Sequence, residues 1–259
     1  MNTTPAANDP GQPTPNAERV ITSIDLPTPK IALAIGAHPD DIEFGCGATL
    51  AKWAAAGCRI HHLVLTDGSK GTWNPDADIA GLIRTRRAEQ TEAARRLGGV
   101  DDVTFLDQVD GELEESVELR SRIARHIREI RPDVVLGHDP WKRHRLHPDH
   151  RHAGFLTCDA IVAARDPHFF REHGVAHHRP SHLLLWEADE ANHAENVGDF
   201  VDAKISALLA HASQFESTMK AVAPEDLDRF SDRIRTRLAE LGRRVDRTAA
   251  EIFTKISDL

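Results

Sequence analysis

Short apolar segments alternate with longer segments of helical periodicity along most of the chain. Apolar runs bounded by glycine, proline or polar loops predict buried strands at residues 30–36, 59–65, 103–106, 133–137 and 182–186. A period of three to four residues predicts helices at residues 45–56, 79–97, 117–130, 150–164 and 201–219. Strands that alternate with helices form βαβ units. The pattern therefore predicts an α/β protein with a Rossmann-like three-layer fold, a mostly parallel sheet and helices on both faces.

The two ends of the chain depart from this pattern. Residues 1–26 are rich in Pro, Thr, Asn and Asp without the apolar core of a signal peptide, and we expect a flexible leader there. Apolar residues recur at steps of three and four from Leu227 to Leu259. This spacing predicts an amphipathic helix over residues 223–259. We expect it to pack on the domain at residues 27–222, or on a partner subunit of a homo-oligomer.

Composition narrows the classes of function. The 259 residues carry a formal net charge of −9, which gives no global attraction to nucleic acid. No apolar stretch is long enough for a membrane span. The three cysteines do not form a close pair, so a disulfide framework is not expected, and a reducing cytoplasm is the simplest location.

Polar residues follow the first predicted strand directly. His38, Asp40 and Asp41 lie at its carboxyl end, where parallel sheets bind ligands. Imidazole and carboxylate are both suitable zinc ligands, and one of two adjacent carboxylates can face a reacting water instead of the metal. The alternative is structural: an aspartate caps the next helix, and His38 only bonds to nearby backbone.

A second polar group follows the strand at residues 133–137. His147 and His150 lie three residues apart at the start of a predicted helix, so they can face the same region of space. Asp149 can orient a histidine by accepting its second ring proton. Alone, this segment could equally be a solvated basic helix entry. Together the two groups supply three plausible ligands and an open metal position, which is typical of a catalytic zinc site.

The two segments His38-Pro-Asp-Asp41 and His147-Pro-Asp-His150 resemble the paired motifs of the PIG-L or LmbE-like family of zinc-dependent N-deacetylases. The resemblance covers about residues 31–214 and implies amide hydrolysis on an N-acetylated amino sugar or glycoconjugate. It implies Zn²⁺, or another divalent metal such as Fe²⁺, held by His38, Asp41 and His150. It further implies Asp40 as general base, His147 as oxyanion stabiliser or proton donor, and Asp149 as the orienting partner of His147.

Weaker matches point to the substrate pocket. Arg86, Asp110 and His193 occupy positions similar to pocket residues of the family, and a salt bridge, a turn and a surface loop are their structural alternatives. Some relatives have a tyrosine before the second motif, but this chain has none, and His144 is a hypothetical replacement. Two other functions remain open. One is an amidase of the same family that acts on a thiol conjugate, and the other is a non-catalytic sugar- or metal-binding protein.

Overall fold

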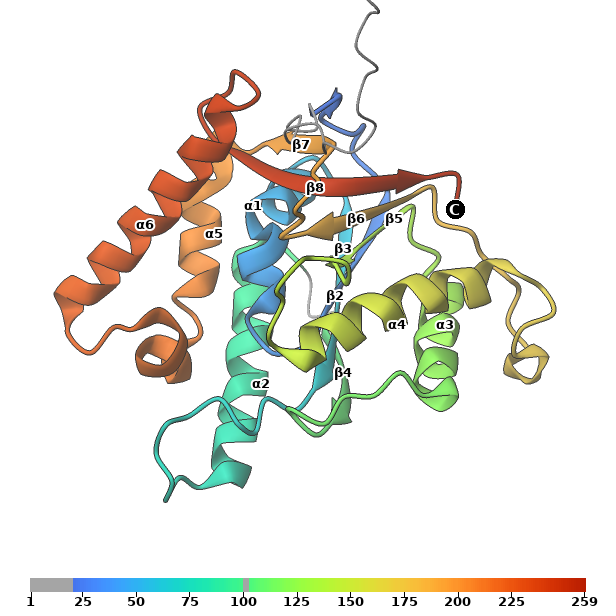
Figure 1. Cartoon of the computed structure of the whole chain (residues 1–259), viewed down its shortest axis with the longest axis horizontal. Helices are drawn as coiled ribbons and strands as arrows, with labels where there is room; N and C mark the ends of the chain where they lie inside the picture. The colour runs from blue at the N-terminus through green and yellow to red at the C-terminus, as the bar shows by residue number, and fades with distance from the viewer. Residues whose placement is uncertain (1–20, 100–102) are drawn as a thin grey trace, which may run out of the picture.

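One mixed sheet forms the centre of the molecule. The computed structural model describes residues 21–99 and 103–259 (Figure 1). Within them, eight strands follow the order β1-β7-β8-β6-β5-β2-β3-β4. Their bounds are β1 Ser23–Ile24, β2 Ile31–Gly36, β3 Arg59–Thr66, β4 Val103–Gln108, β5 Val134–His138, β6 His182–Trp186, β7 His193–Asn196 and β8 Ala250–Ser257. All neighbouring strands are parallel except β8, which is antiparallel to both β6 and β7.

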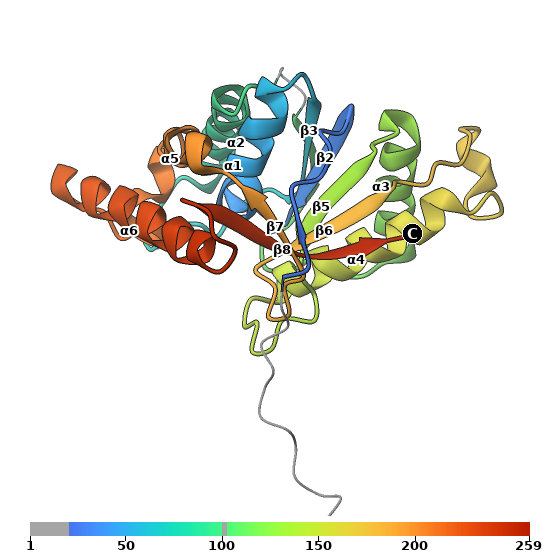
Figure 2. The same ribbon diagram turned by 90° about the horizontal axis from the view of Figure 1, so that it is seen from above.

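Helices cover both faces of this sheet (Figure 2). They are α1 Asp41–Ala55, α2 Ile79–Arg96, α3 Val117–Ile130, α4 Pro148–Arg165, α5 Val201–Leu208 and α6 Pro224–Arg243. Alternate residues of β2 point to opposite faces, as a strand requires. Leu33 and Ile35 join the apolar core beneath α3 and α4, whereas Ala32 and Ala34 join the core beneath α1 and α2. The Rossmann-like three-layer α/β fold expected from the sequence is confirmed.

The C-terminal segment differs from the expectation. The helix predicted over residues 223–259 ends at Arg243, and the chain returns as strand β8 between β6 and β7. Ala249, Ile252 and Ile256 continue the helical spacing by coincidence. The segment Ile252-Phe-Thr254 is rich in β-branched and aromatic side chains, which favour a strand. Buried Phe230, Leu238 and Leu241 pack α6 against its own chain.

Two further boundaries also change. Only Val201–Leu208 of the helix predicted at residues 201–219 is α-helical; a 3₁₀ turn at Ala212–Gln214 and a π-helical turn at Phe215–Met219 follow it. Of the expected leader at residues 1–26, the first 20 residues lie outside the described part. Ser23–Ile24 forms a strand with β7, so the expected leader extended too far into the fold.

The sheet topology fixes where a site can form. The parallel strands β2 and β5 are neighbours although β3 and β4 separate them in sequence. The strand order reverses at this pair, and α/β sheets bind ligands at the carboxyl ends of strands beside such a switch point. His38 and His147 both follow these strand ends. No helix in the described part of the chain is long and apolar enough to cross a membrane.

Candidate active site

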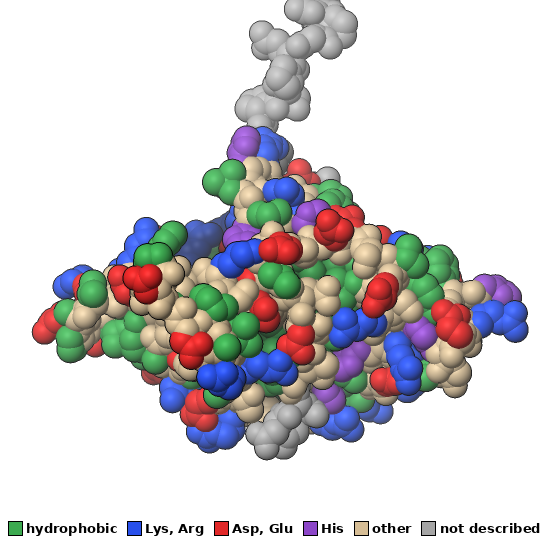
Figure 3. Space-filling view, turned by 90° about the horizontal axis from the view of Figure 1, so that it is seen from below, with side chains coloured by type: hydrophobic (Ala, Val, Ile, Leu, Met, Phe, Trp, Pro, Cys, Tyr) green, Lys and Arg blue, Asp and Glu red, His purple; other side chains and the backbone are tan. Residues whose placement is uncertain are grey.

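A cavity of about 760 Å³ opens at the carboxyl ends of β2 and β5. Its polar side contains the side chains of both sequence motifs, and Phe44, Ile234 and Leu238 from α1 and α6 line its apolar side. Seen from below, the surface is hollowed beside α6, and acidic and basic side chains are interspersed over the face that is drawn (Figure 3). The cavity therefore offers a polar floor with an adjoining apolar wall.

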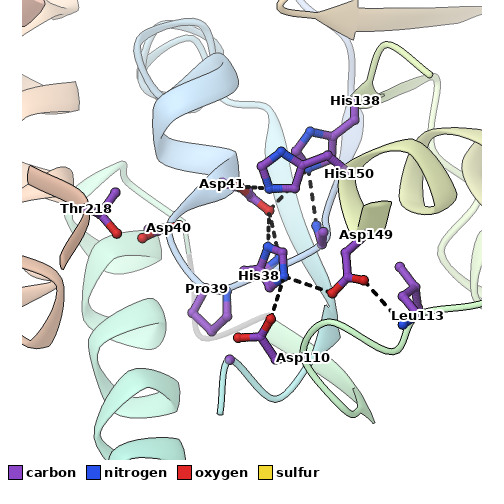
Figure 4. Close-up of polar contacts among 12 residues, drawn as sticks. His38, Pro39, Asp40, Asp41, Asp110, Leu113, His138, Asp149, His150 and Thr218 are labelled. Carbon is purple, nitrogen blue, oxygen red and sulfur yellow. Dashed lines mark hydrogen bonds and ion pairs between the residues drawn. The ribbon is translucent and has the colours of Figure 1, made fainter. Parts of the chain in front are cut away.

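His38 lies among three carboxylates (Figure 4). Its Nε2 is 3.0 Å from Asp110 Oδ1 and 3.0 Å from Asp149 Oδ2. Because both oxygens are acceptors, Nε2 carries a proton and donates it, and Nδ1, which lies 3.3 Å from Asp41 Oδ2, is the ring nitrogen left for a metal. Burial lowers the pKa of His38, but Asp110, Asp149 and Asp41 outweigh it and raise the pKa well above its ordinary value. The cluster thus favours positive charge at this point.

Asp41 is the first residue of α1 and faces the histidines. Its Oδ2 accepts the His38 backbone N–H at 2.7 Å, and its Oδ1 lies 3.2 Å from His150 Nε2. Burial opposes ionisation, but His150 and His138 hold the pKa of Asp41 well below its ordinary value. Asp41 is therefore an ionised carboxylate directed at the imidazole cluster.

The second motif supplies two stacked imidazoles. His147 and His150 lie with ring centroids 4.7 Å apart at the start of α4, where Pro148 occupies the first helical turn. The His147 ring also meets the His38 ring edge-on at 4.7 Å. Burial, His38 and His150 lower the pKa of His147, which favours its neutral form. Both motif histidines thus reach the cavity from one side.

The donors of this cluster fit a divalent transition metal. One ligand atom from each of His38, Asp41 and His150 can be chosen so that all three lie within 4.8 Å of one another. Two imidazoles and one carboxylate match a zinc site with an open coordination position, and the surrounding carboxylates favour a cation. A second set, His38, Asp110 and His147, meets the same distance criterion. It fits less well, because Nε2 of His38 already donates to Asp110.

Asp40 lies on the other side of the backbone from Asp41, toward Thr218 (Figure 4). Its φ of 102° is in the left-handed region, which is uncommon for a residue with a side chain. The Gln90 side chain accepts the Asp40 backbone N–H at 2.9 Å, and Arg86 Nη2 lies 3.6 Å from Asp40 Oδ2. The Asp40 side chain makes no capping hydrogen bond with α1. Burial raises its pKa to about 6, although Arg86 opposes the shift.

Three further predicted residues, Asp149, Arg86 and Asp110, lie at or beside the cavity with different contacts. Asp149 accepts from His38 and from the Gly111 N–H at 2.6 Å, so its expected role as the partner of His147 is replaced by contact with His38. Arg86 and Asp110 line the cavity. Arg86 already donates hydrogen bonds to the Pro39 and Gly68 carbonyls. A Cβ at Gly71 would lie 2.2 Å from Arg86 Nη1, so the loop after β3 needs glycine there.

His144 and His193 do not line the cavity. His144 is exposed on the loop before α4, so it does not stand in for a cavity tyrosine. His193 is fully buried in β7, where it bonds to Ser23 and Glu195. Both were expected to bind substrate. The position of a residue along the chain does not show which way its side chain points.

Two buried residues near the site were missed. His138 ends β5 and lies 3.2 Å from Asp41 Oδ2, while Gln90 of α2 holds the Asp40 backbone. Burial lowers the pKa of His138 to about 4, although Asp41 opposes the shift. Its position at a strand end was a usable signal. Gln90 has no comparable signal in the sequence, because glutamine is common within helices.

A side chain of the C-terminal strand β8 binds the backbone in the middle of helix α1. The helix is kinked at Cys46, whose φ of −147° and ψ of 17° are not helical. Glu251 of β8 accepts the backbone N–H groups of Ala48 and Thr49 at 3.2 and 2.8 Å. Lys204 donates to Glu251 at 2.6 Å and to the Phe44 carbonyl at 2.7 Å. This buried ion pair satisfies the backbone groups that the kink leaves free.

Comparisons with known proteins agree with this arrangement. Residues 33–161 match the model of the PIG-L family, described as GlcNAc-PI de-N-acetylase. Diacetylchitobiose deacetylase of Thermococcus kodakarensis is 36% identical over 190 residues, which cover 72% of this chain and 70% of that protein. The chain belongs to the PIG-L family. This membership rests on sequence over most of the chain.

Structure gives the same result. The N,N'-diacetylchitobiose deacetylase of Pyrococcus horikoshii, solved with its inhibitor, superposes on this PIG-L protein with a TM-score of 0.80. The identity is 28%, and the match covers 88% of this chain and 84% of that one. A 1D-myo-inositol 2-acetamido-2-deoxy-alpha-D-glucopyranoside deacetylase of Kineococcus radiotolerans is 29% identical over 265 aligned positions, covering 77% of this chain and 73% of that protein.

Proposed function

We propose that this PIG-L protein is a zinc-dependent hydrolase that removes the acetyl group from an N-acetylated amino sugar or glycoconjugate. One observation carries the proposal: two adjacent aspartates have different surroundings. Asp41 lies among imidazoles that suit a metal, whereas Asp40 lines the cavity on the other side of the backbone. The site thus combines a set of metal ligands with a separate carboxylate that is available for proton transfer.

His38, Asp41 and His150 would hold the metal. Zinc bound there acts as a Lewis acid that polarises the acetamide carbonyl and acidifies a water molecule; iron(II) suits the same ligands. Nε2 of His38 faces two carboxylates, so Nδ1 is the ring nitrogen left for the metal, and the imidazoles beside Asp41 keep it ionised. Asp149 and Asp110 orient His38 by accepting its Nε2 proton.

Asp40 and His147 would carry the proton transfers. Asp40, with a pKa of about 6, is ionised near neutral pH and can accept the proton of the attacking water. His147 lies at the cavity, and the N–H that its neutral ring retains can stabilise the developing oxyanion. Either Asp40 or His147 then protonates the departing amine, so that acetate and a free amino sugar leave.

The substrate class follows from the relatives. The proteins named above deacetylate diacetylchitobiose or a GlcNAc–inositol by their names, so a GlcNAc-containing glycoconjugate is the first candidate. The cavity of about 760 Å³ is in the size range of small-molecule sites, and apolar side chains of α6 line part of it. An amidase of the same family that acts on a thiol conjugate is the second candidate, because the same residues hydrolyse any linear amide.

The test is a product assay with defined metal. Purified protein is stripped with a chelator, reloaded with Zn²⁺ or Fe²⁺, and incubated with N,N'-diacetylchitobiose, N-acetylglucosamine and N-acylated cysteinyl glucosamine. Acetate and primary amine should be released in equal amounts, and chelation should abolish the release. Cleavage of the cysteinyl amide alone would identify the thiol-conjugate amidase instead. A metal-loaded protein that binds these sugars without cleaving them would show a non-catalytic binding protein.

A further inference from the structure

His138 and Trp186 lie beside Asp41, outside the set of ligands. His138 is the last residue of β5 and Trp186 the last of β6, and the two are paired in the parallel register of these strands. The Asp139 N–H donates to the Trp186 carbonyl at 3.2 Å, and a Cβ at Gly45 would lie 2.4 Å from the indole ring. The indole is therefore held in place from its backbone and from one face.

The contacts of the His138 ring determine its tautomer. Trp186 Nε1 donates to His138 Nδ1 at 3.1 Å, and Arg145 Nη1 lies 3.3 Å from the same nitrogen. Indole and guanidinium groups are donors only, so Nδ1 must be an acceptor without a proton. The single proton of the neutral ring is therefore on Nε2.

The other ring nitrogen, Nε2, faces a carboxylate. It lies 3.2 Å from Asp41 Oδ2 and 3.3 Å from the Ala37 backbone nitrogen. The two neighbours compete, because the amide is a donor and the carboxylate an acceptor. A hydrogen bond to an ionised partner is roughly twice as strong as one between neutral groups, so the carboxylate decides. His138 Nε2–H then donates to Asp41 Oδ2.

Asp41 Oδ2 accepts from two donors, His138 Nε2–H and the His38 backbone N–H, and the ring Nδ1 of His38 lies 3.3 Å from the same oxygen. Two donors fill both lone pairs of a carboxylate oxygen. In the described part of the chain, the partner of Oδ1 is His150, which is itself a candidate ligand. We propose that Trp186 and His138 are positioning residues of the metal centre: they fix Asp41 so that Oδ1 is presented to the metal. This inference rests on the metal site of the proposed function.

The first test measures metal affinity rather than turnover. Zinc dissociation constants are obtained by chelator competition for the wild type, His138→Leu and His138→Gln. Glutamine retains an N–H donor that can reach Asp41, whereas leucine has no donor. We expect a loss of roughly 10- to 100-fold for leucine, typical of removing a group that orients a ligand, and a smaller loss for glutamine. Equal affinity of the wild type and His138→Leu overturns the inference.

Tryptophan variants provide a matched pair. Trp186→Phe removes one of the two donors that set the tautomer, whereas Trp53→Phe makes the same change at a buried indole whose Nε1 has no hydrogen-bond partner. Both shorten a buried side chain, so a general packing effect would weaken zinc binding equally. We expect weaker binding only in Trp186→Phe. Equal affinities of these two variants overturn the contribution of the indole N–H.

Histidine ring ¹⁵N spectroscopy tests the tautomer directly, in metal-free protein. The signal lost in His138→Gln should show the proton on Nε2, and a proton on Nδ1 contradicts the inference. The outcome is separate from that of the proposed function: a wild-type protein that binds zinc but cleaves no acetamide refutes the hydrolase, while the tautomer and the zinc affinities still decide the role of His138.

Discussion

Asp40 and Asp41 are adjacent in sequence, yet two different parts of the fold surround them. Asp41 is contacted from β5, α4 and the loop before α1, through His138, His150 and the His38 backbone. Asp40 is contacted from α2, through Gln90 and Arg86. The positive φ of Asp40 turns the two side chains apart. Identical carboxylates thereby acquire opposite pKa shifts, lowered for Asp41 and raised for Asp40.

The difference teaches how one short motif can serve two purposes. A metal ligand should stay ionised and fixed, which imidazole neighbours and two N–H donors achieve for Asp41. A general base should have a pKa near the working pH, and burial achieves this for Asp40. The proposed roles therefore follow from the neighbours contributed by distant segments rather than from the motif itself.

The largest expected effect comes from exchanging each aspartate for its amide. Asp40→Asn should lower kcat by roughly 10²- to 10⁴-fold, because general-base catalysis contributes about that much, while zinc content stays at the wild-type level. Asp41→Asn should lose the metal as well as activity. Zinc is measured by elemental analysis beside deacetylation rates. Loss of zinc from both variants would contradict the proposal that Asp41 binds the metal and Asp40 does not.

A smaller effect is expected on the α2 side. Gln90→Leu removes the acceptor of the Asp40 N–H and the donor to Glu43, which lies 2.8 Å from Gln90 Nε2. Because small misplacements of a reacting group are costly, kcat should fall about 10- to 100-fold with zinc content unchanged. Unfolding free energy should fall by roughly 1–3 kcal/mol, since buried Glu43 loses a partner.

Gln108→Leu, on the outer strand β4, is the control for this substitution. It makes the same chemical change away from the cavity and should leave kcat unchanged. If the two glutamine variants fall equally in kcat, or if Gln90→Leu loses zinc, then Asp40 does not depend on α2 in the way described.

The smallest effects on zinc affinity and kinetics are expected for residues that surround neither Asp40 nor Asp41. His144→Ala and His193→Ala should leave zinc affinity and KM unchanged, because neither side chain lines the cavity. His193→Ala should still reduce thermal stability, since the buried ring bonds to Glu195 at 2.9 Å, whereas exposed His144 should not. Steady-state kinetics and a melting curve for each variant check this. A raised KM in either would return that histidine to the substrate site.

Much of this site can be predicted from the sequence, because the ends of buried strands can be predicted and the site residues follow them. His38 directly follows an apolar run that stops at Gly36, and Pro148 marks the start of α4, so both motifs could be placed at one edge of the sheet. The sequence does not predict which side chains from distant segments contact one another. Asp149 could have oriented either His38 or His147, and the choice depends on a contact across 111 positions. The apolar spacing of β8 continues that of α6, so the sequence pattern predicts a helix where the structure has a strand.

Glu251 has a consequence for biosynthesis. It accepts the N–H groups of Ala48 and Thr49 from about 200 positions further along the chain. Domains form progressively during translation, at about 5–20 residues per second, so α1 emerges many seconds before its acceptor exists. Until then the interrupted middle of α1, the helix that begins at Asp41, lacks its partner. Completion of the catalytic centre is thus tied to synthesis of the final strand.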